Sequence, residues 1–320
     1  MTNIFTMDRN LALEFVRVTE AAAVAASKWI GRGDKHAADQ AAVDAMRDRF
    51  NAIDFHGEVV IGEGKKDEAP ELYVGEQLGT KNGVNLDIAV DPLECTDSVA
   101  NGVPNAISVI ATGSSGSLFK APDMYMEKIA CGPKAAGSIS LLASVEDNIL
   151  NVAERLDKHV SEMVVVMLDR PRHEEIKKRI RSTGARVRLI SDGDVAGAIA
   201  PSLYGSGIDM LYNIGASAEA VLAAVAIKCL GGDFQARLAP KDDKQRTELK
   251  AMGITDIEKI LTLEDLAKGQ DLTFTATGVI DGPLLKGVRY TTHHCITHSV
   301  VMRVRTGTVR FIETHHRLES

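Results

Sequence analysis

Residues 86–96 read LDIAVDPLECT. The mostly apolar run 86–90 predicts a buried strand that ends at Asp91 and Pro92. Glu94 follows Asp91 by three residues, and Pro92 fixes the turn between the two acids. Carboxylates that converge at a strand end suit a hard cation such as magnesium or manganese, which prefers oxygen ligands. The alternative interpretation is a simple Asp-Pro turn.

Similar apolar runs that end in polar or glycine residues recur along the chain, with helical patterns among them. The predicted strands are 59–61, 86–90, 106–111, 163–168, 186–190 and 209–214, with a terminal hairpin of 298–305 and 308–313 around Thr306-Gly307. The predicted helices are 9–30, capped by Asp8 and stopped at 31–33, then 37–51 and 217–230. Because ligands of open α/β sheets bind beyond the strand ends, the acids there indicate the site. We therefore expect a layered α/β protein with lobes 1–158 and 159–320, and a charged surface excursion at 233–270.

A second acidic stretch follows the apolar run 59–61, where two glycines flank Glu63. Gly62 and Gly64 allow a sharp turn and a close approach of a ligand to the backbone. Glu63 and Asp67 are predicted to face one site, whereas the alternative is a charged surface loop.

Two further stretches follow predicted strands. Asp192-Gly193-Asp194 comes after the strand 186–190, and in isolation it is typical of a solvated turn. Arg170-Pro171-Arg172-His173 comes after 163–168, and its two guanidinium groups match the geometry of phosphate oxygens. Basic residues continue through 177–181, so the spacing alone favours the exposed start of a basic helix.

Composition restricts the class of protein. The chain has 320 residues, of which 45% are hydrophobic and 25% are charged, so it can bury a large core in one domain or two lobes. A formal net charge of −7 argues against nucleic acid as the main partner, although bound cations still permit an anionic substrate. Four scattered cysteines show no zinc-site or disulfide spacing, which indicates a reducing, cytoplasmic setting. Since no signal-like N-terminus and no bilayer-length apolar run is found, we expect no membrane span.

Several common motifs are absent from the sequence, namely GxGxxG, GxxxxGK[ST] and HExxH. Dinucleotide binding and P-loop chemistry therefore lose their usual support. What remains is a set of carboxylates at strand ends, the hydroxyl of Thr96 beside them, and arginines elsewhere. This combination is typical of metal-assisted phosphoryl transfer to water, and the spacing alone leads no further than a metal-dependent phosphatase.

The sequence resembles the class II fructose-1,6-bisphosphatases, also described as fructose-1,6-/sedoheptulose-1,7-bisphosphatases, from about Leu11 to the C-terminal hairpin. The matching blocks occur in the family's order and spacing, and they are GRGDK at 31–35, the segment 62–70, DPLECT at 91–96, APDMYMEK at 121–128, RPRH at 170–173 and DGD at 192–194. The resemblance implies the layered α-β-α-β-α fold of the lithium-sensitive sugar phosphatases. It also implies a metal-binding N-terminal lobe and a sugar-phosphate-binding C-terminal lobe that act as one catalytic unit.

The same resemblance implies the residues of the site. Manganese or magnesium would be bound by Asp39, Glu63, Asp91, Glu94 and Glu219. Asp67 and Thr96 would orient and activate the attacking water. The substrate would contact Glu94, Cys95, Thr96, Tyr125, Arg170, Pro171, Arg172, Asp192, Gly193, Asp194 and Ala216. The implied reaction removes the 1-phosphate of fructose 1,6-bisphosphate and gives fructose 6-phosphate, as in gluconeogenesis.

Three departures from the family pattern fall at the site. Cys95 stands where the family usually has glycine, so its side chain either crowds the phosphate or demands an unusual φ. Residues 215–220 read GASAEA instead of roughly GGAPEG, which retains Glu219 but puts Ala216 at a substrate position. Lys65 stands where many members have glutamate.

These departures support a second hypothesis, a weakly active or inactive paralogue that binds sugar phosphates in a regulatory role. A third hypothesis is a related phosphatase for inositol or nucleotide phosphates, against which the blocks around Tyr125 and Arg170 argue. The resemblance further implies a homodimer or homotetramer. The sequence leaves open the choice between fructose and sedoheptulose bisphosphate, the preferred metal and any allosteric effector.

Overall fold

The computed structural model describes residues 11–64 and 72–318, and the chain divides into two compact units. Unit 1 comprises Met1–Gly116 and Gln270–Ser320, and unit 2 comprises Ser117–Gly269. These units differ from the predicted lobes 1–158 and 159–320. The difference arises because C-terminal strands pair with a strand of the N-terminal part, a long-range connection that no local sequence pattern displays.

Unit 1 contains an eight-stranded sheet among its described residues. Its strands are β1 (His56–Ile61), β2 (Gln77–Leu78), β3 (Asn85–Glu94), β4 (Ala106–Ser114), β11 (Thr273–Ile280), β12 (Arg289–Tyr290), β13 (His294–Arg303) and β14 (Thr308–Arg317). Their order is β12-β13-β11-β4-β3-β1-β2, and β14 pairs with β13. β1 and β3 are parallel, whereas β3, β4, β11 and β13 form successive antiparallel pairs.

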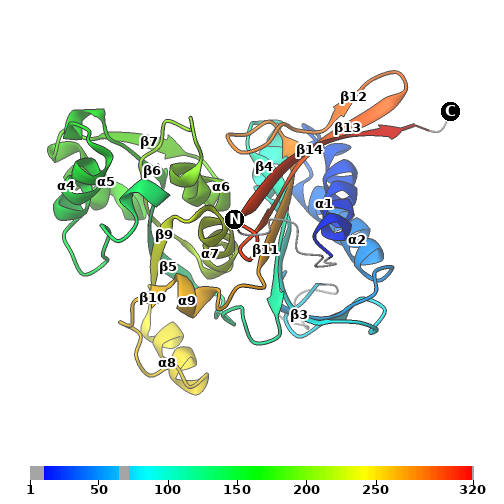
Figure 1. Ribbon diagram of the computed structural model, residues 1–320, viewed down its shortest axis with the longest axis horizontal. Helices are drawn as coiled ribbons and strands as arrows, with labels where there is room; N and C mark the ends of the chain where they lie inside the picture. The colour runs from blue at the N-terminus through cyan, green and yellow to red at the C-terminus, as the bar shows by residue number, and fades with distance from the viewer. Residues whose placement is uncertain (1–10, 65–71, 319–320) are drawn as a thin grey trace, which may run out of the picture. The chain divides into compact units, whose positions relative to one another are not determined.

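The helices of unit 1 are α1 (Ala12–Ser27), α2 (Lys35–Phe50) and α3 (Thr96–Asn101) in the part of the chain that the structure describes. Figure 1 shows α1 and α2 side by side, and α1 packs against β11 and β13. Phe15 of α1 and Phe50 of α2 meet Phe55, with ring centroids 5.5–6.0 Å apart. These rings close the core between the helices and the sheet, since the apolar faces of both helices are buried there.

Unit 2 contains a six-stranded sheet in the order β10-β9-β5-β8-β6-β7. Its strands are β5 (Tyr125–Cys131), β6 (Val164–Leu168), β7 (Arg186–Ile190), β8 (Met210–Ala216), β9 (Asp233–Leu238) and β10 (Leu261–Thr262). Its helices are α4 (Val145–Leu156), α5 (Glu174–Ser182), α6 (Asp194–Ile199), α7 (Ser217–Leu230), α8 (Asp243–Ala251) and α9 (Leu263–Leu266), with short 3-10 turns η1 (Pro133–Ala135), η2 (Val160–Glu162), η3 (Pro171–His173) and η4 (Ala200–Ser202).

Helices cover both faces of the sheet of unit 2. Ile149 of α4 and Ile180 of α5 share a buried cluster with Ile129 of β5 and Met210 of β8. α6 contacts β6 and β8, and α7 contacts β5 and β8. Ile129 of β5 lies in the cluster with α4 and α5, whereas the side chain before it, Lys128, pairs with Asp194 of α6. Since successive residues of a strand point to opposite faces, α6 and the helix α7 that packs against it cover the other face of the sheet.

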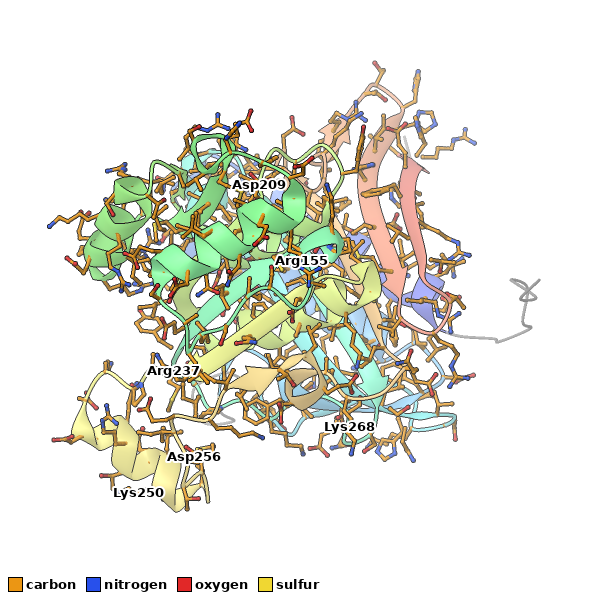
Figure 2. All side chains as sticks on the ribbon, turned by 60° about the vertical axis from the view of Figure 1, so that its left-hand side comes forward. Arg155, Asp209, Arg237, Lys250, Asp256 and Lys268 are labelled. Carbon is orange, nitrogen blue, oxygen red and sulfur yellow. The ribbon has the colours of Figure 1, made fainter. Side chains whose placement is uncertain are left out.

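Ion pairs tie the strands of unit 2 together. Arg237 of β9, labelled in Figure 2, lies 2.6 Å from Glu127 of β5. Asp209, also labelled there, pairs with Lys158 at 2.5 Å and accepts a hydrogen bond of 2.9 Å from the backbone N–H of Val164. Both pairs join segments that are far apart in the sequence.

The predicted α/β class is confirmed, whereas several element bounds differ from the predictions. α1 ends at Ser27, before the predicted stop at 31–33, and the predicted cap Asp8 lies outside the described residues. β5, β9, β11 and α4 were not predicted. The terminal hairpin is confirmed with longer strands, and α8 lies in the charged excursion 233–270. Among the described residues, no helix combines the length and apolarity that crossing a bilayer requires.

Candidate active site

A β-bulge in β3 brings two predicted metal ligands to one face of the sheet. Asp91 pairs with Val109 of β4, and Glu94 pairs with Ile107, so three steps on β3 match two steps on β4. Paired residues of an antiparallel ladder share a face, and Val109 and Ile107 lie two residues apart on one face. Asp91 and Glu94 therefore point to the same side, although a spacing of three in a regular strand would separate them. The strand continues past Pro92 and is longer than predicted.

Cys95, the next residue, adopts the left-handed conformation that favours glycine, with φ 74° and ψ 51°. The predicted unusual φ is thus confirmed. Its side chain is 6% exposed and belongs to the hydrophobic core cluster of unit 1. α3 begins directly afterwards, so Thr96 is the first residue of a helix and is half-buried.

Glu63 lies two residues past β1, at the start of a loop whose two ends are joined. The N–H of Glu63 donates to the carbonyl oxygen of Leu72 at 3.0 Å, and the N–H of Val74 donates to that of Gly64 at 3.0 Å. A Cβ at Gly62 would lie 2.0 Å from the Leu72 carbonyl oxygen, so this close approach requires glycine. The backbone on both sides of Glu63 is therefore fixed by its hydrogen bonds and close packing with residues 72–74.

Asp39 lies in the second turn of α2 and is half-buried. Burial raises the pKa of this carboxyl, and the charge of His36 opposes the rise. α2 packs against α3 and β3, and two backbone hydrogen bonds of 2.8 and 2.9 Å from Gly31 and Gly33 tie the preceding loop to α3. A carboxylate whose ionised form is penalised by burial is stabilised by a bound cation.

In unit 2, Arg172 is held over the ring of Tyr125, with its guanidinium carbon 4.5 Å from the ring centroid. Its Nε also donates to the carbonyl oxygen of Ile214 at 2.8 Å. Tyr125 begins β5 and pairs with Ala216 at the end of β8. Three predicted substrate residues thus lie together, and Arg170 and the exposed Pro171 come directly before Arg172 in the chain.

His173 is a buried residue of this region to which the sequence assigned no role. Its Nδ1 lies 2.8 Å from the carbonyl oxygen of Leu168, and the N–H of Ile214 donates to its Nε2 at 2.8 Å. These contacts assign the neutral tautomer with its proton on Nδ1. Burial lowers the pKa of His173, which favours the same neutral form. His173 therefore ties the η3 turn, with its arginines, to β6 and β8.

The stretch 192–194 forms the turn that starts α6, with Gly193 at φ 90°. Asp194 is buried and forms an ion pair with the ammonium of Lys128, a lysine of β5 that is 1% exposed. Asn213 Nδ2 donates to Asp194 Oδ1 at 2.7 Å. The interpretation as a solvated turn is therefore wrong for Asp194. Sequence reasoning assigned no role to Lys128, which follows another charged residue, Glu127, within β5.

Glu219 lies in the first turn of α7. Its Oε2 is shielded from solvent and accepts no hydrogen bond from the residues that the structure describes. Burial raises the pKa of this carboxyl most strongly, while Lys128 lowers it and Asp194 raises it further. A shielded carboxylate oxygen without a donor is costly, and a bound cation offsets that cost. Glu219 therefore has the character of a metal ligand.

The two residues before α7 differ in their demand for glycine. A Cβ at Gly215 would lie 2.1 Å from Asp194 Oδ2 and 3.1 Å from Lys128 Nζ, so a side chain has no room there. Ala216 has φ −67° and ψ 156°, an extended conformation that any residue adopts. The chain keeps glycine where the structure needs it and departs from the family pattern where it does not.

The predicted ligands are distributed over both units, with Asp39, Glu63, Asp91 and Glu94 in unit 1 and Glu219 in unit 2. Lys65 and Asp67 lie outside the described residues. Within residues 11–64 and 72–318, no group of three or more His, Cys, Asp or Glu side chains is close enough to hold a metal. The ligand set offers oxygen atoms alone, and the shielded oxygen of Glu219 fits a hard cation such as magnesium or manganese.

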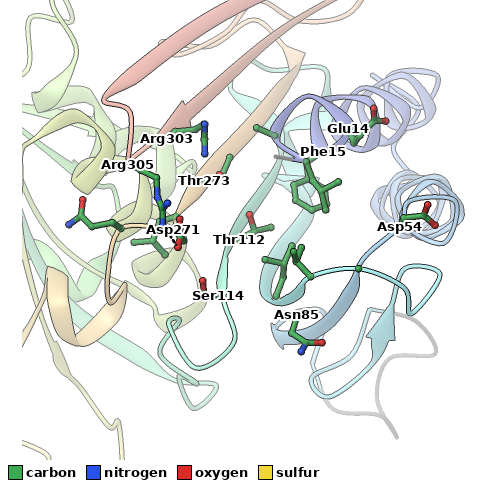
Figure 3. Close-up of a pocket in the computed structure, with 17 residues that line it drawn as sticks. Glu14, Phe15, Asp54, Asn85, Thr112, Ser114, Asp271, Thr273, Arg303 and Arg305 are labelled. Carbon is green, nitrogen blue, oxygen red and sulfur yellow. Dashed lines mark hydrogen bonds and ion pairs between the residues drawn. The ribbon is translucent and has the colours of Figure 1, made fainter. Parts of the chain in front are cut away.

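Unit 1 also contains a cavity of about 610 Å³ (Figure 3). Asn85 at the first position of β3 lines it, together with Phe15, Thr112 and Arg303. Asp91 and Glu94 lie at the other end of the same strand, so the cavity and these two acids are at opposite ends of β3. No predicted site residue lines this cavity.

Known proteins resemble the chain over nearly its whole length. The sequence model of the family described as "Bacterial fructose-1,6-bisphosphatase, glpX-encoded" matches residues 9–316. The "Fructose-1,6-bisphosphatase class 2" of Haemophilus influenzae is 46% identical over 326 residues, with 98% of each chain covered. Two proteins of Synechococcus strains JA-3-3Ab and JA-2-3B'a(2-13), each a "D-fructose 1,6-bisphosphatase class 2/sedoheptulose 1,7-bisphosphatase", are 42% identical over 334 residues, covering 97% of this chain and 96% of each relative.

Proposed function

The chain belongs to the family of bacterial class 2 fructose-1,6-bisphosphatases, and from this premise we propose the residues and the cofactor of its reaction. It is a phosphoric monoester hydrolase of carbohydrate metabolism that removes the 1-phosphate of fructose 1,6-bisphosphate and releases fructose 6-phosphate. Sedoheptulose 1,7-bisphosphate is a second candidate substrate, because two relatives carry both names.

We assign divalent manganese or magnesium to the five carboxylates named above. Such a cation, when bound, neutralises charge on the phosphoryl oxygens and activates water. The observation that carries this assignment is the bulge in β3, which turns Asp91 and Glu94 to one face and is followed directly by the helix that starts at Thr96. Two further observations support it, namely the burial of Asp39 and the shielded oxygen of Glu219, because both carboxylates are stabilised by a bound cation.

The contacts that fix a side chain indicate its role toward the substrate. Arg172 is preorganised by the ring of Tyr125 and by the carbonyl oxygen of Ile214, so its remaining donors can bind the phosphate that is not cleaved. The hydroxyl of Thr96 relays a proton from the attacking water toward Asp67, as the family resemblance implies. In this assignment Arg172 positions the substrate and Thr96 takes part in proton transfer.

The hypothesis of an inactive paralogue loses its main support. Cys95 keeps the left-handed backbone of a glycine, and its side chain packs in the core. Ala216 stands in an extended conformation that needs no glycine. Both departures from the family pattern are therefore compatible with turnover.

We further propose a homodimer or homotetramer in the cytoplasm, with a small-molecule sugar bisphosphate as the partner. The net charge of −7 argues against nucleic acid. All four cysteines are free and buried, as expected of a protein from a reducing compartment.

Phosphate release from fructose 1,6-bisphosphate by metal-free protein, with and without added manganese, tests the proposal. We expect turnover that depends on manganese and a lower rate with inositol or nucleotide phosphates. Circular dichroism verifies that the metal-free protein is folded. A folded protein that releases no phosphate with manganese, magnesium or zinc would instead support the binding paralogue.

A further inference from the structure

We propose that Lys128 and Asp194 form a buried positioning pair for the turn at 192–193, and that Asp192 rather than Asp194 contacts the sugar. This inference rests on the proposed function and deepens it, since it divides the acidic turn into one substrate-binding residue and one anchor. Lys128 then acts on the reaction through Asp194 without touching the substrate.

The carboxylate of Asp194 is already engaged on both oxygens. Oδ2 pairs with the ammonium of Lys128, and Oδ1 accepts a hydrogen bond of 2.7 Å from Asn213. The three residues are 5%, 1% and 0% exposed, so a sugar hydroxyl has no access to this carboxylate. Asp192, two residues earlier, is half-buried and lies at the accessible end of the turn.

The pair can hold the turn because three strands converge on it. Lys128 belongs to β5 and lies directly opposite Asn213 of β8. Asn213 Oδ1 accepts a hydrogen bond of 3.3 Å from the N–H of Leu168 at the end of β6. Asp194 is the first residue of α6, and Gly193 before it has φ 90°, so fixing Asp194 also fixes the two residues that precede it.

Strand β8 leaves room for the ion pair at Gly215. Gly215 leaves the space in which Asp194 Oδ2 and Lys128 Nζ lie, since a Cβ there would approach these atoms to 2.1 and 3.1 Å. Removing one member of a buried ion pair leaves an uncompensated charge, whereas removing both charges together is often nearly neutral. A positioning pair and a direct substrate contact therefore predict different behaviour of the double variant.

The experiment compares Lys128→Gln, Asp194→Asn and the double variant, in which two amides can still hydrogen-bond. We measure KM and kcat for fructose 1,6-bisphosphate, the dissociation constant of fructose 6-phosphate by calorimetry, and the Tm. Each single variant is expected to raise KM and the dissociation constant by about tenfold or more, and the double variant to return both to within about threefold of the wild type. If Asp194 contacts the sugar, the double variant instead keeps the defect of Asp194→Asn.

Two control variants sharpen the result. Asp192→Asn is expected to raise KM in the wild-type background and to raise it less in the Lys128→Gln background, because that variant has already displaced the turn, and to leave the Tm unchanged. Lys158→Gln breaks a different ion pair of the same unit and is expected to leave KM unchanged. Single variants that lower the Tm but not the affinity for sugar phosphate would show a merely structural pair and overturn the proposal. A wild type that binds fructose 6-phosphate without turnover would refute the proposed function, while the binding data would still test the pair.

Discussion

The acids of unit 1 and those of unit 2 are placed by different means. At the end of β3, the backbone itself places Asp91 and Glu94, through a bulge and the left-handed Cys95 that follows. In unit 2, a network of side chains places Asp194, through the buried Lys128 and Asn213 in the middle of β5 and β8. The first arrangement needs an unusual backbone, and the second needs every polar partner to be present.

This difference determines how each region responds to substitution. Where the backbone positions an acid, shortening that acid removes its function and few contacts, which for Asp91 include a hydrogen bond of 3.1 Å from the N–H of Leu93. Where a buried network positions it, loss of any member disturbs the rest, because an unpaired polar group in a low-dielectric interior is costly. Unit 1 should therefore show separable defects, and unit 2 coupled ones.

The largest expected effect is that of Asp91→Ala. Loss of a metal ligand should lower kcat/KM by more than about 100-fold, the upper range for residues that merely support a ligand. Manganese binding, measured by calorimetry, should weaken in parallel, while the Tm of the metal-free protein changes little. The matched control is Asp97→Ala, which removes an exposed acid of α3 that pairs with Lys35 at 3.1 Å. Full manganese-dependent activity of Asp91→Ala would contradict the ligand assignment.

Gly215→Ala and Ala216→Gly test the coupled region. A methyl group at 215 would collide with Asp194 Oδ2, and overpacking of this kind costs about 1–3 kcal/mol. Ala216→Gly restores the family residue at a position whose extended backbone does not require glycine, and we expect a change below about 1 kcal/mol. Urea unfolding measures both values. Equal stability of the two variants would show that the side chains of Asp194 and Lys128 shift at little cost to accept a methyl group at residue 215.

The sequence predicted the acidic strand ends better than it predicted their supports. An apolar run that stops at Asp91 is a local signal, and so is the glycine-flanked Glu63. The bulge that unites Asp91 with Glu94 depends on the register with β4, which no local pattern contains. The assignment of Asp39, inside a helix, as a ligand rests on family resemblance and not on spacing.

Buried polar residues were the least predictable part of the site. Lys128 and His173 are among the most buried residues of unit 2, yet a lysine or a histidine in isolation usually indicates the surface. Their burial is possible because partners from distant segments satisfy them, such as Asp194 for Lys128. The division into units was missed for the same reason, since β11 returns to pair with β4.

A smaller effect, which depends on pH, is expected at His173. Burial lowers its pKa below the ordinary 6.5 in the folded state, so the unfolded chain binds the proton first as the pH falls. The contribution of neutral His173 to the free energy of unfolding is therefore complete above about pH 6.5. It declines as the pH falls toward the lower pKa of the folded state.

The variant His173→Asn retains a donor for the Leu168 carbonyl oxygen but cannot titrate. We expect it to cost about 1 kcal/mol at pH 8 and to flatten the fall in unfolding free energy between about pH 7 and pH 5. Urea unfolding across this range gives the slopes. His298, whose pKa burial also lowers, contributes equally to both proteins and cancels in the comparison. Parallel slopes would mean that His173 does not control the pH dependence.

The smallest effect is expected at Cys95, where two terms oppose each other. Cys95→Gly relieves a left-handed conformation that costs a side chain about 1 kcal/mol, but it also removes a buried thiol from the core of unit 1. The net change in unfolding free energy should stay within about 1 kcal/mol, and turnover should stay within about twofold, because the thiol packs in the core. Cys95→Ala keeps the strain and loses most of the packing, so it should be less stable than Cys95→Gly. Turnover that rises well beyond twofold in Cys95→Gly alone would indicate that the thiol lies against the phosphate. The backbone conformation at residue 95 would then not be the only feature of Cys95 that affects the site.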